Sequence, residues 1–289
     1  MKNTLVDLLS EYRSQRSFNA QEYVAKKVTA IREHFEKHGL KAAVLGVSGG
    51  VDSAVVNHLL IEALGPSNVY AMSLPIFGSS GSTGQQEAAT MAYQSFPGIV
   101  VKNLSDMSSV ANNTVGSRNS FTAGQVDYWL RPVILYGMAA RLQSAKIKAV
   151  VVGTINRDEG SYIGYFGKHT DICDLQIISD LHKSEVYQVA KHYGVLDAII
   201  NRAPEGNVHD GKTDEEMIGT SYDMVELFTG YYLNNLTKFS HFSEEDQLKW
   251  NDVTSAINKR RSENYFKYDN GLSCYFIDVL DRTVPGGWK

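Results

Sequence analysis

Two glycines and three polar side chains follow a short apolar run, and their types suit the binding of a phosphate chain. The run Ala42 to Val47 is too short for a helix and is typical of a strand that is buried on both faces. Gly49 and Gly50 then allow a tight turn and a close approach of the backbone to a ligand. Because a helix is expected from Ala54 onward, backbone N–H groups and a helix dipole would favour an anion at this turn.

The polar side chains of this loop are Ser48, Asp52 and Ser53, and they indicate which anion it binds. The two hydroxyls can donate to phosphate, whereas the carboxylate of Asp52 repels it unless a divalent cation bridges the two. The loop has neither the Gly-Lys-[Ser/Thr] of a Walker loop nor the Gly-x-Gly-x-x-Gly of a dinucleotide-binding turn. Ser-Gly-Gly-x-Asp-Ser at a strand-to-helix junction resembles the pyrophosphate loop of the N-type ATP pyrophosphatases, which cleave ATP between the α and β phosphates.

A second polar cluster follows another apolar run, Ala149 to Gly153. It extends from Thr154 to Glu159 and so carries an amide and three charges at the end of a predicted strand. Since open α/β sheets bind ligands at the carboxyl ends of their strands, Glu159 can supply a second carboxylate to a cation held by Asp52. Alone, Glu159 is more typical of a surface carboxylate, and its pairing with the first loop favours the functional interpretation.

Alternating strands and helices are expected to position these two clusters. The predicted strands cover residues 42–47, 69–74, 99–104 and 149–153, and the predicted helices cover residues 20–38, 54–61, 83–95, 125–144 and 183–193. This alternation predicts an α/β fold with a doubly wound, open parallel sheet flanked by helices. We expect one domain over residues 1–289, with one or two helical turns before residue 117, a mobile loop over 201–216 and a helical C-terminal part from about residue 217.

Composition limits the partners and the compartment. At 289 residues and 43% hydrophobic content, the chain can bury a real core, and its formal charge of −4 gives no general attraction to nucleic acid or anionic membranes. No stretch approaches a membrane span, and the first residues lack the apolar core of a signal peptide. Cys173 and Cys274 offer neither a disulfide framework nor a metal cluster. We therefore expect a cytoplasmic protein with no nucleic-acid or membrane partner.

The chain resembles the ammonia-dependent NAD synthetases from about residue 20 to residue 267. Besides the first loop, the stretches Gly153–Lys183, Thr213–Gly219 and Ser221–Tyr222 carry this resemblance. It implies a homodimer with the Rossmann-like fold of the N-type ATP pyrophosphatases. It also implies that ATP adenylates the nicotinate carboxylate of deamido-NAD and that ammonia then displaces AMP. Ammonia is the expected nitrogen source because the length leaves no room for a glutaminase domain with its nucleophilic cysteine.

The resemblance further implies roles for individual residues. Mg²⁺ would be held by Asp52 and Glu159, and Lys183 corresponds to the family's catalytic-site lysine. The substrate-side aspartate of the family corresponds to Asp171 or Asp174, and the sequence leaves this choice open. The residues expected at ATP and its pyrophosphate are Gly46, Ser48, Gly49, Gly50, Ser53, Thr154 and Lys183. Those expected at the deamido-NAD substrate are Arg131, Tyr165, Phe166, Lys168, Asp171 and Asp174.

Three departures from the family pattern fall in the acceptor half of the site. They lie at Trp129–Arg131, at His169–Cys173 and at Pro204–Asn207, where Glu205 stands in place of a phosphate-binding hydroxyl. Two alternatives therefore stay open. One is ATP pyrophosphate cleavage with another acceptor, either a different carboxylate or a nucleobase thiolated through Cys173. The other is a catalytically silent nucleotide-binding homologue, against which the two metal-binding carboxylates argue.

Overall fold

The computed structural model describes residues 4–77, 88–92, 94, 96, 98–159, 172–202, 213–232, 243–264 and 275–280. Within them, six parallel strands form one sheet in the order β3-β2-β1-β4-β5-β6. The strands are β1 (Ala42–Gly46), β2 (Val69–Ser73), β3 (Val100–Val101), β4 (Ala149–Gly153), β5 (Leu175–Gln176) and β6 (Tyr275–Phe276). The chain moves outward from β1 to β3 and then returns to β4 beside β1, so the switch point of the topology lies between β1 and β4.

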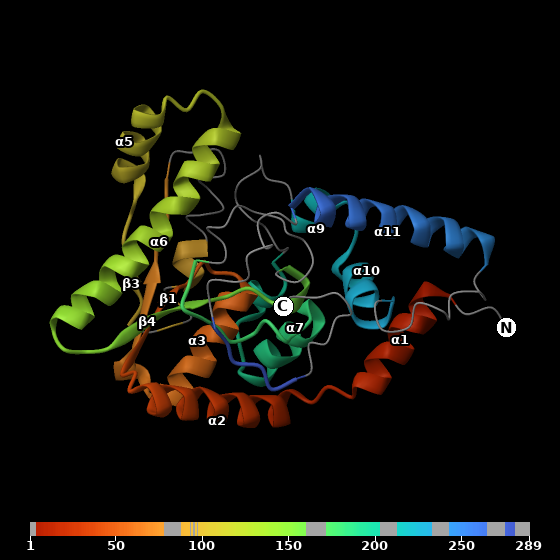
Figure 1. The fold of residues 1–289 in the computed structure, drawn as a ribbon, viewed down its shortest axis with the longest axis horizontal. Coiled ribbons are helices and arrows are strands. Elements are labelled where there is room, and N and C mark those ends of the chain that lie inside the picture. Colours follow the sequence, from red (N-terminus) through yellow and green to blue (C-terminus); the bar gives the residue numbers. More distant parts are fainter. Residues whose placement is uncertain are drawn as a thin grey trace.

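Helices cover both faces of this sheet (Figure 1). The helices before residue 202 are α1 (Leu5–Arg16), α2 (Ala20–His38), α3 (Val51–Leu64), η1 (Pro66–Asn68), α5 (Ser105–Val115), α6 (Ser120–Ser144), α7 (Lys183–His192) and α8 (Asp197–Ile200). Those after residue 213 are α9 (Asp214–Ile218), α10 (Tyr222–Glu226), the π-helical η4 (Leu227–Tyr232) and α11 (Glu244–Asn264). Helices α2, α3 and α7 pack on one face of the sheet, and α6 packs on the other.

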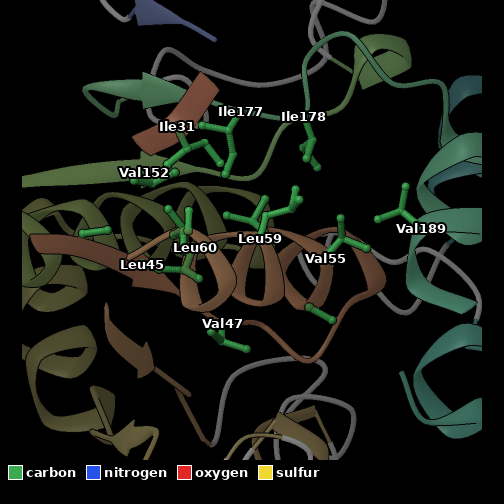
Figure 2. Close-up of a cluster of buried hydrophobic side chains, with 14 of the residues drawn as sticks. Ile31, Leu45, Val47, Val55, Leu59, Leu60, Val152, Ile177, Ile178 and Val189 are labelled. Atoms are coloured by element: carbon green, nitrogen blue, oxygen red, sulfur yellow. The ribbon is translucent and has the colours of Figure 1, made fainter. Parts of the chain in front are cut away.

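The central strand β1 is buried on both faces, as its apolar run predicts. Leu45 lies in the larger core cluster with Leu59 and Leu60 of α3, where all three side chains are fully buried (Figure 2). Its neighbour Val44 points to the other face and packs with Leu142 of α6. Each such buried side chain contributes roughly 1.5–3 kcal/mol. The alternation of side chains across the strand therefore fixes the orientation of β1 and the position of the loop that follows it.

The α/β fold with an open parallel sheet is confirmed, and so are most predicted elements. Helix α2 spans the predicted residues 20–38 and ends at Gly39, whose φ of 64° closes the helix. Strand β4 matches its predicted bounds, while β2 and α7 each end one residue early. Helix α3 begins at the loop and extends to residue 64. Of the helix expected over 83–95, only residues 88–92 and 94 are described, and all of them are helical.

Other predicted elements differ from the structure. The strand expected over 99–104 is limited to β3, an edge strand whose two valines are 46% and 41% exposed. The polar stretch after it forms the 11-residue helix α5, and α6 begins at residue 120, after the N-cap Asn119. The helical pattern from residue 217 is interrupted within the described residues, which form α10, η4 and α11. Residues 203–212 of the predicted mobile loop lie outside the described residues.

Helix α1 and strands β5 and β6 had no counterpart in the prediction. Helix α1 begins with a capping box, in which Thr4 and Asp7 exchange hydrogen bonds. It buries Leu5, Leu8 and Leu9 against residues of α10, η4 and α11. Among the described helices, none is both long and apolar enough to cross a membrane.

Candidate active site at the carboxyl ends of β1 and β4

The loop between β1 and α3 is held in shape by its own hydrogen bonds. Gly49 has a φ of 85°, and a side chain at this position would collide with the backbone of Ala88. The Ser53 hydroxyl donates to the Gly50 carbonyl at 2.9 Å and accepts from the Ser48 backbone N–H at 3.2 Å. The Gly50 N–H lies 3.3 Å from the Ser48 hydroxyl. The loop is therefore preorganised, and the first turn of α3 begins directly after it.

Lys183, the first residue of α7, brings the two sequence clusters together. Its Nζ lies 2.6 Å from Asp52 Oδ2 and 3.1 Å from Glu159 Oε1. Asp52 lies in the first turn of α3, which follows β1, and Glu159 lies shortly after β4. Asn156 links the same groups, because its Nδ2 donates to Asp52 Oδ1 at 2.9 Å and its Oδ1 accepts from the Glu159 N–H at 3.0 Å. Side chains from both sides of the switch point thus meet at one ammonium group.

The charges around this ammonium are mostly negative. Burial raises the pKa of Glu159 to about 7 against the effect of Lys183, and the charges of Asp52 and Asp214 add to the rise. Burial alone would lower the pKa of Lys183, but Asp52 and Glu159 hold it above its ordinary value, so the lysine stays charged. The Tyr222 hydroxyl lies 3.2 Å from both Glu159 Oε1 and Asp214 Oδ2, and its ring lies 5.1 Å from Lys183 Nζ.

The donor set of this cluster fits a magnesium ion that arrives with a nucleotide. Within the described residues, no three His, Cys, Asp or Glu side chains form a complete metal site. Asp52 and Glu159 nevertheless contact the same Lys183 Nζ, so their oxygens face one point, and their side chains keep 15% and 27% exposure to solvent. Magnesium is commonly bound through one or two carboxylates, with phosphate oxygens and water completing its shell. A cation here would also offset the charges of Asp52 and Asp214, which add to the rise that burial causes in the pKa of Glu159.

Of the other site residues predicted from the sequence, some lie at the same edge of the sheet as Lys183, Asp52 and Glu159, and others make their contacts elsewhere. Gly46 ends β1 and Thr154 directly follows β4, so both are at the edge of the sheet that carries the cluster. Asp174 directs its oxygens elsewhere: Oδ2 accepts from the Val151 N–H at 2.7 Å, and Oδ1 accepts from the Tyr136 hydroxyl at 3.2 Å. Arg131 lies on α6, 5.6 Å from the centre of the Tyr128 ring, and donates to the Asp127 carbonyl at 3.3 Å. Tyr165, Phe166, Lys168 and Asp171 lie outside the described residues.

Two residues that touch the cluster received no role from the sequence. Asn156 was noticed only as an amide at a strand end, although its position three residues before Glu159 is what allows it to link the Asp52 carboxylate to the Glu159 backbone N–H. Tyr222 belonged to a stretch that carried the resemblance, but it is 63 residues from Glu159 in the chain. No local pattern of residues could predict that contact, because it depends on how α10 packs against α7.

Comparison with known proteins places the chain in a family. A family model described as NAD synthase matches residues 23–270. A protein of Wolinella succinogenes named NH(3)-dependent NAD(+) synthetase is 32% identical over 260 residues, which cover 86% of this chain and 93% of that protein. The protein of the same name from Methanocaldococcus jannaschii is 32% identical over 221 residues, which cover 74% and 82%.

Solved structures share the fold. An NMN synthetase from Francisella tularensis superposes with a TM-score of 0.69 at 24% identity, covering 86% of this chain and 96% of that one. An NH3-dependent NAD synthetase from Campylobacter jejuni gives a TM-score of 0.66 at 20% identity, covering 91% and 100%. The family model and the curated relatives confirm, over most of the chain, the resemblance inferred from the sequence. This chain belongs to the NAD synthase family.

Proposed function

We propose that this chain is a ligase that converts deamido-NAD to NAD with ATP and ammonia and releases AMP and pyrophosphate. The observation that carries the proposal is the meeting of Lys183, Asp52 and Glu159 beside the preorganised loop of residues 48–53. The acceptor and the nitrogen source are supported by the names of the relatives.

The first half-reaction needs a site that stabilises a departing pyrophosphate. A nicotinate carboxylate oxygen attacks the α-phosphorus, the bond from the α-phosphorus to the bridging oxygen breaks, and pyrophosphate leaves with the electron pair. The loop N–H groups and the hydroxyls of Ser48 and Ser53 would bind this anion, and Lys183 would neutralise charge as it develops. Preorganised donors of this kind are each worth about 10²–10³ in rate. When bound, Mg²⁺ supplies Lewis-acid stabilisation of the phosphate oxygens, and Asp52 and Glu159 would hold it.

In the second half-reaction, ammonia attacks the carbonyl carbon of the mixed anhydride, AMP leaves with the electron pair, and the nitrogen loses a proton. We assign the acceptor side to Arg131, Tyr165, Phe166 and Lys168, as the family resemblance implies, and the ATP side to Gly46 and Thr154 besides the loop. Of the two candidate aspartates, we assign the substrate-side role to Asp171. The reason is that both oxygens of Asp174 already accept hydrogen bonds from Val151 and Tyr136.

The proposal includes a homodimer. Helices α5 and α6 lie side by side (Figure 1), and both expose apolar side chains that are available for contact with a second subunit. The most exposed are Val110 at 67%, Val115 at 62%, Val133 at 58% and Phe121 at 57%. We expect the protein to sediment as a dimer, and we expect Val133→Glu to weaken that dimer. Sedimentation velocity over a concentration series tests this, and a wild-type monomer at micromolar concentration would contradict it.

The test of function measures pyrophosphate release with ATP, Mg²⁺ and ammonium, with and without an acceptor, in the wild type and in Asp52→Ala. Release that depends on deamido-NAD, yields NAD and is lost in the variant is the expected result. Because one structural neighbour is named NMN synthetase, nicotinate mononucleotide is included as a second acceptor. Activity with that acceptor alone would replace deamido-NAD in the proposal. Tight ATP binding without any acceptor-dependent release would indicate the silent binder.

A further inference from the structure

A chain of hydrogen bonds, part-buried at Tyr12 and buried beyond it, runs from helix α1 to the backbone of Lys183. The Tyr12 hydroxyl lies 2.7 Å from His182 Nε2, and His182 Nδ1 lies 2.7 Å from Asp158 Oδ1. The other oxygen of Asp158 accepts a hydrogen bond from the Lys183 N–H at 2.8 Å. Asp158 and His182 are completely buried. The chain thus connects residues that are 170 positions apart in the sequence and ends at the residue that carries the catalytic ammonium group.

The partners of Asp158 determine the direction of these hydrogen bonds. Burial raises the pKa of Asp158, but His182 and the Lys183 N–H outweigh this and hold its pKa below the usual range, so its carboxylate is ionised and only accepts. His182 therefore carries its hydrogen on Nδ1. Nε2 shares the next hydrogen bond of the chain with the Tyr12 hydroxyl, at 2.7 Å. Every polar atom along the chain has a partner, as a buried network requires.

Two carboxylates that are consecutive in the sequence, those of Asp158 and Glu159, contact the backbone N–H and the side-chain Nζ of Lys183. Asp158 accepts from its backbone N–H, and Glu159 lies 3.1 Å from its Nζ. Because α7 begins at Lys183, the bond to Asp158 fixes the first residue of the helix and with it the point from which the side chain extends. A small shift of that point would move Nζ away from Asp52, which it now meets at 2.6 Å.

Helix α1 lies outside residues 23–270, the part that the family model matches, yet its side chains reach this network. Arg16 donates to Glu185 Oε2 at 2.9 Å, and Glu185 in turn accepts from the His182 N–H at 2.9 Å. The absence of a side chain at Gly230 leaves room for the Tyr12 ring, which a Cβ there would strike. The Tyr12 ring meets the His182 ring edge-on, at 85° and 5.6 Å between centres.

We infer that Tyr12, His182 and Asp158 are positioning residues for Lys183, so that α1 helps to set the geometry of the active site. This inference rests on the proposed role of Lys183 in the departure of pyrophosphate. Docking of α1 alone would need only its apolar side chains and the pairing of Arg13 with Glu226, which is 2.6 Å long and does not involve α7. The buried polar chain does more than dock the helix, because it ends on the lysine itself. Misplacement of a catalytic group by about 1 Å can cost 10²-fold in rate.

The experiment compares four variants of the full-length protein. Tyr12→Phe removes one hydroxyl, His182→Ala removes both ring nitrogens, and His182→Asn restores an N–H donor close to the position of Nδ1. Arg13→Gln is the matched control, because it weakens the docking of the same helix and leaves the chain to Lys183 intact. Each variant is measured for kcat, for KM of ATP, for affinity toward inorganic pyrophosphate by calorimetry, and for Tm.

We expect Tyr12→Phe to lower kcat and the affinity for pyrophosphate about fivefold, the equivalent of one neutral hydrogen bond, with KM for ATP changed less than twofold. His182→Ala should lose more than tenfold in both, and His182→Asn should recover most of that loss. Arg13→Gln should lower Tm at least as much as Tyr12→Phe and leave kcat unchanged. If kcat follows Tm across all four variants, or if His182→Asn is no better than His182→Ala, the inference is wrong.

Pyrophosphate binding separates this inference from the proposed function, because calorimetry needs no acceptor. A wild type that forms no NAD but binds pyrophosphate, with the same ranking of variants, would overturn the function and keep the positioning role. Equal pyrophosphate affinity in all variants would overturn the positioning role, whatever the acceptor is.

Discussion

Replacement of Lys183 by methionine tests the central feature of the site, the single ammonium between two carboxylates. Methionine keeps most of the length and the apolar stem and removes the charge. If Lys183 neutralises the departing pyrophosphate, its loss should cost about 10²–10³ in kcat, as does the loss of one preorganised donor elsewhere. KM for ATP should change far less, because the charge on the leaving group develops only in the transition state.

The same substitution should not unfold the protein. Breaking a buried ion pair costs about 3–5 kcal/mol, whereas an exposed pair is worth about 1 kcal/mol or less. The side chains of Asp52 and Glu159 are 15% and 27% exposed, so water reaches both, and Glu159 can take up a proton because its pKa is about 7. We therefore expect a loss of about 1–2 kcal/mol in the free energy of unfolding.

The assay is continuous detection of pyrophosphate at saturating ATP, with urea unfolding of the same samples. Lys191→Met is the control, because Lys191 lies on the same helix but is exposed in its last turn. A kcat within threefold of the wild type would refute the role of Lys183. A fall in ATP affinity as large as the fall in kcat/KM would also refute it, since uniform binding of ATP would then explain the effect.

Three further predictions follow from the site and its support. Gly49→Ala should weaken ATP binding at least tenfold by calorimetry, because a φ of 85° and the nearby Ala88 backbone exclude a side chain; unchanged affinity would contradict the loop geometry. The affinity for Mg²⁺ with ATP should rise with pH up to about 7 and then level off, because the proton on Glu159 must leave before a cation binds, and Glu159→Gln should remove this dependence. Lys27→Met should destabilise the protein by about 3–5 kcal/mol in urea unfolding and leave KM for ATP unchanged, because it leaves the fully buried Asp180 without its cation.

The sequence predicts best those elements whose burial is strongly patterned. Strand β4 and helix α2 match their predicted bounds, because one is a continuous apolar run and the other repeats Val24, Val28, Ile31 and Phe35 on one face before a glycine. Strands β5 and β6 have only two residues each, too few for any periodicity to be read. They exist because the neighbouring strand supplies hydrogen-bond partners, which is a property of the sheet and not of the segment.

The site likewise contains residues that the sequence could predict and contacts that it could not. The two carboxylates could be predicted because loops at the carboxyl ends of parallel strands lie at one edge of the sheet, and Asp52 and Glu159 are neighbours because β1 pairs with β4. Lys183 was predicted from the family resemblance alone. The contacts of Tyr12 and Tyr222 could not be predicted. They depend on how helices far apart in the sequence pack around α7, and a tyrosine in an amphipathic helix is more often only part of the core.

The position of Lys183 itself argues for function. A cation at the first residue of a helix faces the positive end of the helix dipole, and burial adds a cost of desolvation. The fold offsets both costs with carboxylates: Asp158 at the backbone N–H, and Asp52 and Glu159 at Nζ. The first residue of a helix need not be a lysine, and an apolar residue with a neutral cap would cost less free energy at this buried position. In the proposed function these groups form a matched set, with two carboxylates to hold a cation and one ammonium to meet a phosphate. A free anion would meet one favourable charge and two unfavourable ones, so the site should bind ATP far better with Mg²⁺ than without it.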